Sequence, residues 1–165
     1  MIRKDREITD QNLIDLIIQS SDVCRLGMYD GDYPYIVVMN YGYKPGTPAF
    51  LYFHSAPKGK KIDIIRKNNK VCFEFDIDHE LITEGLPCDF SMQYKSVVGY
   101  GKIYIVEDEE EKRSGLDIIM KHYTKEKHFK YNETTLKRTT VLKIQIESVT
   151  GKQKTSKPIS NSENE

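Results

Sequence analysis

The chain has 165 residues, with 25 lysines and arginines balanced by 25 aspartates and glutamates, so its formal net charge is zero. This length suits one domain with a substantial core, and the charge balance argues against nucleic acid or an anionic membrane as partner. The charged N-terminus lacks the apolar segment of a signal peptide, and no stretch is long enough to span a bilayer. Three widely spaced cysteines, Cys24, Cys72 and Cys88, indicate reduced thiols, so we expect a cytoplasmic protein.

The first third of the chain changes from helical to strand periodicity. Residues 11–20 carry apolar side chains at helical spacing and predict an amphipathic helix. Apolar runs at 23–29 and 35–43 flank an Asp-Gly turn and predict a β-hairpin. A third strand is expected over 49–54, so three antiparallel strands follow the helix.

The middle of the chain predicts a short helix over 60–67 and a strand over 71–77, where apolar and polar residues alternate. We expect residues 78–91 to form a loop long enough to cover a pocket. The longest strand should run over 92–106, where two glycines mark a bulge or the close approach of another group.

The last third begins with an acidic helix start at Asp108 and apolar residues at helical spacing up to Tyr123. A basic stretch follows, which we interpret as a solvated surface, and then a strand over 142–147. We assign residues 1–150 to one domain and predict that the polar residues 151–165 form a disordered tail. Six strands joined mainly by tight turns favour a mainly β fold, an antiparallel barrel with helices at its ends and flank.

One segment combines a strand end with a helix start. The strand ends at His54 and Ser55, the chain turns through Pro57 and Gly59, and Lys60 and Lys61 open the next helix. Free N–H groups and the positive dipole end of a helix favour an anion such as phosphate. The motif is not a Walker A loop, because it lacks that motif's first glycine and its final Ser or Thr. The alternative interpretation is a surface turn with solvated lysines.

Two further segments could complete a site. Residues 37–40 offer backbone groups and an asparagine, and residues 94–101 combine a lysine and a serine with the two strand glycines. Together with residues 54–61 they would suit a flat heterocycle that carries a polyol and a phosphate. Flavin mononucleotide (FMN) fits this description.

The same segments resemble the signatures of a known family. Tyr35–Tyr43, Leu51–Ala56 with Gly59–Lys61, and Tyr94–Gly101 are similar to segments of the split-barrel flavoproteins related to pyridoxamine 5′-phosphate oxidase. Within that superfamily the chain most resembles the nitroimidazole-resistance branch. The resemblance covers about residues 3–147.

The resemblance implies a homodimer of six-stranded, antiparallel Greek-key split barrels with two FMN sites at the subunit interface. It implies that the flavin is lined by Val37, Val38, Met39 and Asn40, and that its ring and ribityl chain are contacted by His54 and Ser55. It also implies that the phosphate is held by Lys60 and Lys61, and that the ring is approached from the long strand by Ser96, Val97 and Gly99.

His54 is the candidate catalytic residue, because it could donate a proton to a substrate reduced near the flavin. The spacing of the other histidines and the cysteines favours no metal site. Val37 stands where pyridoxamine phosphate oxidases offer an arginine, and the chain lacks their arginine-rich C-terminal segment. Pyridoxamine phosphate is therefore not the expected substrate.

The expected function is that of an FMN-dependent oxidoreductase that reduces a small electrophile such as a nitroaromatic. A second hypothesis is a non-catalytic module on the same barrel that binds flavin or haem for storage or sensing. A third is a dimeric scaffold with an empty cleft. The fold alone does not choose among them, because function resides in the site.

Overall fold

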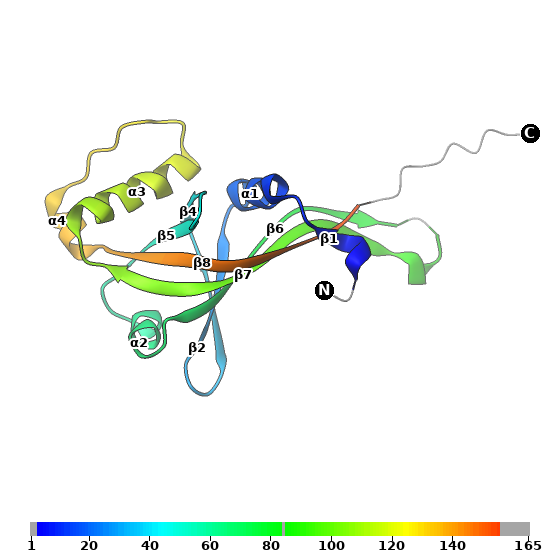
Figure 1. Cartoon of the computed structure of the whole chain (residues 1–165), viewed down its shortest axis with the longest axis horizontal. Coiled ribbons are helices and arrows are strands. Elements are labelled where there is room, and N and C mark those ends of the chain that lie inside the picture. Colours follow the sequence, from blue (N-terminus) through cyan, green and yellow to red (C-terminus); the bar gives the residue numbers. More distant parts are fainter. Residues whose placement is uncertain (1–2, 84, 156–165) are drawn as a thin grey trace, which may run out of the picture.

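A computed structural model describes residues 3–83 and 85–155 of the chain. It is mainly antiparallel β-sheet with flanking helices, which confirms the fold class expected from the sequence (Figure 1). None of the helices in these two segments is long and apolar enough to cross a membrane. The elements in chain order are η1 (Lys4–Arg6), β1 (Glu7–Ile8), α1 (Gln11–Ser20), β2 (Cys24–Tyr29), β3 (Pro34–Met39), β4 (Tyr41–Lys44), β5 (Phe50–Ser55), α2 (Lys60–Lys67), β6 (Lys70–Ile82), η2 (Pro87–Asp89), β7 (Ser91–Val106), α3 (Glu109–Tyr123), α4 (Glu133–Arg138) and β8 (Thr140–Lys154).

The described part of the chain has eight strands where six were predicted. The strand expected over 35–43 divides at Asn40 into β3 and β4, and β1 is an additional short strand. The hydrogen-bonded order is β3-β2-β6-β7-β8-β5-β4, with β1 paired to β8. Strands β3 and β4 therefore lie at opposite ends of this order although a single residue joins them. The sheet must curl until its two ends meet at Asn40.

Side-chain alternation continues through this junction while the hydrogen-bonding partner changes. Met39 and Tyr41 both point into the core, and Asn40 between them is exposed. Strand β3 pairs with β2 before the junction, and β4 pairs with β5 after it. One continuous extended segment thus belongs to both ends of the barrel.

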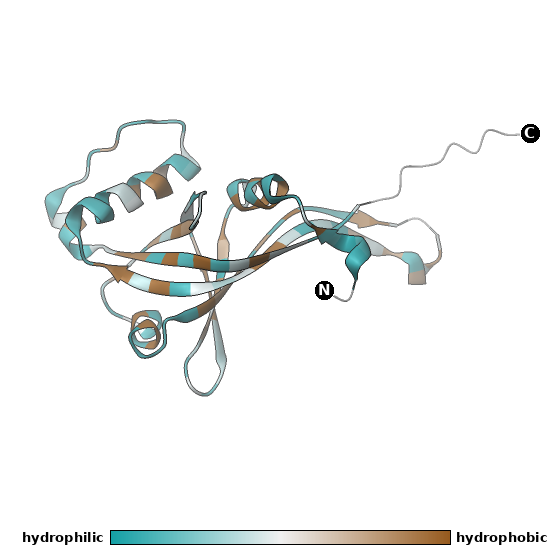
Figure 2. Ribbon diagram, in the orientation of Figure 1, coloured by the Kyte–Doolittle hydropathy of each residue, from teal (hydrophilic) through white to brown (hydrophobic). Residues whose placement is uncertain are grey.

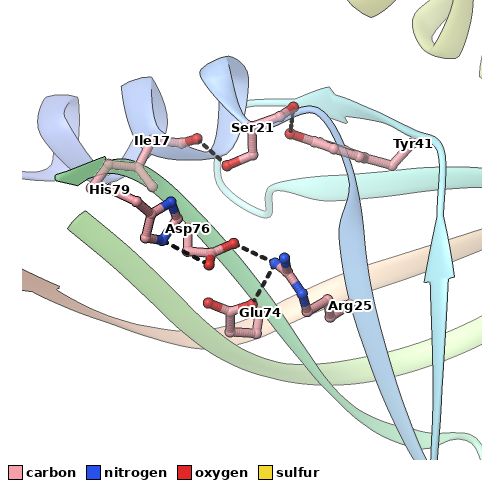
Figure 3. Close-up of polar contacts among 7 residues, drawn as sticks. All are labelled: Ile17, Ser21, Arg25, Tyr41, Glu74, Asp76 and His79. Atoms are coloured by element: carbon pink, nitrogen blue, oxygen red, sulfur yellow. Dashed lines mark hydrogen bonds and ion pairs between the residues drawn. The ribbon is translucent and has the colours of Figure 1, made fainter. Parts of the chain in front are cut away.

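Tyr41 fastens the junction to α1. Its hydroxyl donates to the backbone carbonyl of Ser21 at the C-terminal end of the helix, at 2.9 Å (Figure 3). The Ile18 carbonyl also lies within hydrogen-bonding distance of this hydroxyl. The helix covers the residues that the sequence predicts and begins after the N-cap Asp10, and its apolar side faces the sheet (Figure 2). Burial raises the pKa of the Tyr41 hydroxyl, which therefore stays protonated as the donor that these carbonyls require.

Two predictions about irregular segments are wrong. The loop expected over 78–91 begins later than predicted, because β6 continues to Ile82 and pairs there with the start of β7 at Ser91. Residues 151–154, assigned to a disordered tail, belong to β8, where Gly151 pairs with Ile8 of β1 and is buried against it. Hydrogen bonds to β1 and β7 order this segment, although it contains no large apolar side chain to bury. The rest of that predicted tail, residues 156–165, lies outside the described residues.

Gly42 allows α3 to approach the sheet. A Cβ atom at this position would lie 2.5 Å from the backbone carbonyl carbon of Ile118 and the backbone nitrogen of Ile119 in α3. Such a clash with backbone atoms cannot be relieved by a side-chain rotation. Helix α3 therefore depends on a residue without a side chain at this point of β4.

We expect Gly42→Ala to lower the free energy of unfolding by roughly 1–3 kcal/mol, because α3 must shift away from the sheet. Urea denaturation followed by circular dichroism measures the change. Gly27→Ala is the matched control, since a Cβ atom there meets its nearest neighbour, the Cys72 carbonyl oxygen, at 3.4 Å. Equal stability of the two variants would contradict the assignment.

Candidate functional site

The start of α2 has the features of an anion site. Its N-cap is Gly59, which has a φ of 129° and offers no side chain to cap the helix, and a Cβ atom there would meet nothing within 4 Å. The N–H groups of Ile62 and Asp63 donate to the Gly59 carbonyl, at 2.9 and 3.2 Å. The first amides of a helix lack intrahelical acceptors, so such a helix start can offer hydrogen-bond donors to an anion.

The two lysines at this helix start differ in their surroundings. Lys60 Nζ lies 2.8 Å from Asp30 Oδ2 and 4.7 Å from the centre of the Tyr35 ring. The hydrogen bond from Lys60 lowers the pKa of the Asp30 carboxyl to about 2. Lys61 is half-buried, and burial lowers the pKa of its ammonium group. Since no carboxylate among the described residues pairs with Lys61, it is the lysine more available to a bound anion.

A cleft of about 310 Å³ lies beside the ends of β3 and β5. Asn40 and His54 reach it from the sheet, and α3, α4 and the segment between these helices form the rest of its wall. Most of this wall is apolar, which suits the apolar part of a small ligand, while Asn40 and His54 are exposed at its edge. The residues contributed by the helical side are Leu116, Ile119, Met120, Tyr123, Tyr131, Asn132, Thr135, Leu136 and Thr139.

Hydrogen bonds fix the helical wall of this cleft. The Tyr131 hydroxyl donates to Asp117 of α3 at 2.8 Å, and burial raises its pKa. The Asn132 side chain caps α4 by accepting from the N–H groups of Thr134 and Thr135, at 2.9 and 3.3 Å. These contacts hold α4 against α3 and keep the cleft open beside His54.

Lys60 belongs to a second cleft of about 620 Å³ between α2 and the turn that joins β2 to β3. Asp30 and Gly31 line its far side. The structure therefore places His54 and Lys60, which were predicted to belong to one site, in two clefts that share no lining residue. Residues 55–59 join the two along the chain, and Gly59 is the N-cap of α2.

The four residues predicted to line a cofactor along β3 have different environments. Only Asn40 reaches a described cleft. Val37 packs against the core and Met39 is buried in it, while Val38 is 62% exposed on the outer face of the sheet. Ser55, on β5, is buried, and its hydroxyl donates to the Ala56 carbonyl at 3.0 Å.

The predicted residues on the long strand β7 lie away from both clefts. Val97 is fully buried in the core, and a Cβ atom at Gly99 would come within 2.2 Å of the Phe73 ring. Gly99 thus makes room for a core phenylalanine. Ser96 is half-buried on the outer face, opposite Asp76 of β6. Their assignment to a cofactor stays a prediction.

The sequence analysis missed the part of the cleft formed by α4. A capping pattern could have revealed this helix, because Asn132 is followed by a glutamate and two threonines. It was instead interpreted as part of a basic surface stretch. With six residues, α4 is too short for helical periodicity to show it.

A polar cluster on the outer face of the sheet was also missed. Arg25 of β2 contacts Glu74 at 3.1 Å and also pairs with Asp76, which lies 3.0 Å from His79 (Figure 3). Burial, followed by the nearby Asp76, raises the pKa of the Glu74 carboxyl. Arg25 is opposite Val38 in the strand register, so charged and apolar groups alternate across this face.

Comparison with known proteins identifies the family. The model of the pyridoxamine 5′-phosphate oxidase family matches residues 10–153, which is most of the chain. The chain belongs to this family. A search of curated proteins found no match.

Several solved structures resemble this member of the pyridoxamine 5′-phosphate oxidase family. A candidate 5-nitroimidazole antibiotic resistance protein from Bacteroides thetaiotaomicron is 40% identical, with 89% of this chain and 86% of that chain covered and a TM-score of 0.79. The flavocytochrome Anf3 of Azotobacter vinelandii is 16% identical, and the match covers 94% of this chain and 72% of that chain with a TM-score of 0.77. A FAD- and haem-binding protein of Mycobacterium smegmatis is 13% identical, and the match covers 93% of this chain and 75% of that chain with a TM-score of 0.80. The last two show likeness of fold alone.

The pairing of Asp30 with Lys60 can be tested by titration. We expect carboxyl NMR to give Asp30 a pKa of about 2, and Lys60→Met to raise it toward the ordinary value near 3.9. Because the folded-state pKa is the lower one, the pair stabilises the fold above about pH 4, and this contribution is lost as the pH falls through about 2.

Lys61→Met is the matched control for this titration. It removes the adjacent cation but leaves the contact between Asp30 and Lys60, so the Asp30 pKa should not move. If Lys61→Met raised the Asp30 pKa as much as Lys60→Met does, the assignment of Lys60 as the partner of Asp30 would be wrong.

Proposed function

We propose that this protein binds FMN and uses it to reduce a small electrophile, of which a nitroaromatic compound is the most specific example. The observation that carries the proposal is the uncapped start of α2, where Lys61 has no carboxylate partner in the described structure, directly after the strand that presents His54. An anion site and an apolar cleft are thus one turn of chain apart. A phosphorylated flavin needs both.

The residues at the helix start fit the phosphate. The helix N-terminus offers backbone donors, Gly59 leaves space for close approach, and Lys61 adds a charge that is already half-buried. Binding a dianion would relieve the cost of burying this ammonium group. Lys60 would serve as a second, outer contact, because it must share its charge with Asp30.

The residues beside His54 fit the aromatic end of the ligand. The cleft lies within the size range of small-molecule sites, its wall is mostly apolar, and Asn40 and His54 supply a few polar groups at its edge. When bound, FMN supplies the electron and hydride transfer. The chain itself orients the ligand, excludes water, and holds a proton on His54 for delivery to the reduced substrate.

We further propose a homodimer with cofactor sites at its interface. The outer face of the sheet exposes apolar side chains, among them Ile36 and Val38 of β3 and Tyr100 of β7, around the polar cluster at Arg25. A face of this kind suits a protein partner better than water. Ser96 lies on this face and not in either cleft, so a second copy would be the one to bring β7 to the flavin.

The name of one structural neighbour supports the proposed reduction of a nitroaromatic compound. That protein, at 40% identity, is a candidate nitroimidazole resistance protein. The alternative is a non-catalytic flavin or haem module, for which His54 would be the available ligand. We place the protein in the cytoplasm, since its three cysteines are free thiols.

The binding proposal predicts that the purified protein takes up FMN and shows bound-flavin absorption. Lys61→Met should weaken FMN binding about 10- to 100-fold, as expected for loss of a charge-assisted contact to phosphate, and should hardly change riboflavin binding. Fluorescence titration with both ligands measures the difference. Lys58→Met, in the same turn but before the helix, is the control and should have little effect.

Three outcomes would count against this assignment. A colourless protein that does not take up added FMN would exclude flavin chemistry at this site. A Soret band would favour the haem alternative. If Lys61→Met weakened the binding of FMN and of riboflavin equally, Lys61 would not be a phosphate ligand.

The catalytic proposal predicts that His54→Gln keeps FMN but reduces a nitroaromatic substrate about 10²- to 10⁴-fold more slowly, the loss expected for a proton donor. Single-turnover reduction by the prereduced protein isolates this step. His128→Gln, an exposed histidine on the segment between α3 and α4, is the control and should retain full rate. An unchanged rate in His54→Gln would assign the proton to solvent.

A further inference from the structure

The ends of β6 and β7 form an arm that projects beyond the rest of the sheet. Within the described residues, strand β8 accompanies β7 only as far as the pair of Tyr94 with Lys154, and residues 80–82 and 91–93 pair there only with each other. A bulge at Asp78, which has a φ of 58°, marks the start of this two-stranded segment. Two strands alone cannot bury an apolar face.

The arm exposes apolar side chains. Leu81 and Met92 are cross-strand neighbours, and both are exposed, Leu81 by 59%. Leu86 is 68% exposed and Phe90 is also exposed, on either side of η2. Four large apolar groups on a short projection are unusual for a surface that faces water only.

The turn that carries two of these groups is built by specific hydrogen bonds. The Leu86 N–H donates to Asp89 Oδ2 at 3.0 Å, and the Asp89 N–H donates to the Leu86 carbonyl at 2.8 Å. Gly85 has a φ of 91° and packs against the Asp89 side chain. These contacts hold Leu86 and Phe90 outward in a defined arrangement.

The opposite end of the molecule has complementary properties. Figure 1 places α3 and α4 at one end of the longest axis and the turn between β6 and β7 at the other. Exposed Met120 and Tyr123 lie at the mouth of the His54 cleft. None of the cations of residues 121–138 forms an ion pair within the described structure: Lys121, Lys125, Lys127, Lys130, Lys137 and Arg138.

The arm carries the opposite charge. Its described residues include the carboxylates of Asp78, Glu80 and Asp89 and no lysine or arginine between positions 78 and 92. Lys95, at the base of the arm, pairs with Asp78 at 2.7 Å, whereas Glu80 and Asp89 form no ion pair with the cations of residues 3–83 and 85–155. An acidic, apolar projection and a basic, apolar cleft mouth thus occupy the two ends of one molecule.

We infer that the arm of one copy docks on the α3–α4 end of a second copy, where Leu86 and Phe90 cover the mouth of the His54 cleft. A two-fold axis perpendicular to the long axis exchanges the two ends, so it forms this contact twice and closes the assembly as a dimer. The inference rests on the dimer proposed above and gives each active-site cleft a wall from the partner. Charge complementarity sets the direction of the pairing.

The first test uses the apolar groups of the arm. Leu86→Ser combined with Phe90→Ser should raise the dimer dissociation constant at least tenfold, measured by sedimentation velocity over a dilution series. Tyr33→Ser is the matched control, because Tyr33 is 71% exposed at the turn between β2 and β3 and should leave the dimer unchanged. All three side chains are exposed, so the variants should fold. An unchanged constant in the arm variant would overturn the inference.

The second test maps the contact with a native thiol. Cys88 is exposed on η2, whereas Cys24 is buried. In a Cys72→Ser background, Thr134→Cys on α4 should give a diamide-induced disulfide dimer that joins Cys88 to position 134, identified by peptide mass spectrometry. Asp32→Cys on the turn between β2 and β3 should not cross-link to Cys88. Cross-linking at position 32 in place of position 134, or at neither, would refute the pairing.

FMN uptake measured on the same samples separates this inference from the proposed function. If the protein binds FMN and the arm variants do not change its dimer dissociation constant, the proposed function stands and the arm contact is refuted. If the arm variants weaken the dimer but the protein takes up no FMN, the arm contact stands and the proposed function is refuted.

Discussion

A single extended segment belongs to both ends of the sheet, and the rest of the structure depends on this constraint. Strand β3 pairs at one end and β4 at the other, and Asn40 alone joins them. The sheet can satisfy both sets of hydrogen bonds only by curling around its core. Tyr41, the next residue, then binds the carbonyls at the end of α1, which fixes the helix against the same junction. Asn40 faces outward at this junction and lines the cleft that holds His54.

The surroundings of α2 explain why the two lysines at its start have different environments. Successive residues at the start of a helix point about 100° apart, so the surroundings of the helix decide what each one meets. The hairpin of β2 and β3 brings Asp30 to Lys60, while Lys61 turns toward the interior and loses part of its hydration. A free, partly desolvated cation is a better anion ligand than a paired one. We therefore propose Lys61 as the main phosphate ligand and Lys60 as an outer contact.

Local sequence predicted the elements whose signals are local. Helices α1 and α2 have the bounds that apolar spacing indicates, and the turn after Tyr29 joins a hairpin as an Asp-Gly pair should. Prediction failed where order comes from distant partners. Residues 151–154 are polar, yet β1 and β7 pair with them on both sides. A loop was predicted over residues 78–82 as well, although β7 supplies a partner strand for residues 80–82.

The sequence by itself determined the family, the strand-to-helix turn at Gly59, and the chemistry of the residues around it, because these depend on residue types at fixed spacing. Only the tertiary structure decided how those residues are distributed. It placed His54 with α4 in one cleft, Lys60 with Asp30 in another, and Val97 and Gly99 in the core. Spacing along a chain sets which face of an element a side chain occupies. What lies opposite that face is set by strand order and helix packing, which long-range contacts alone establish.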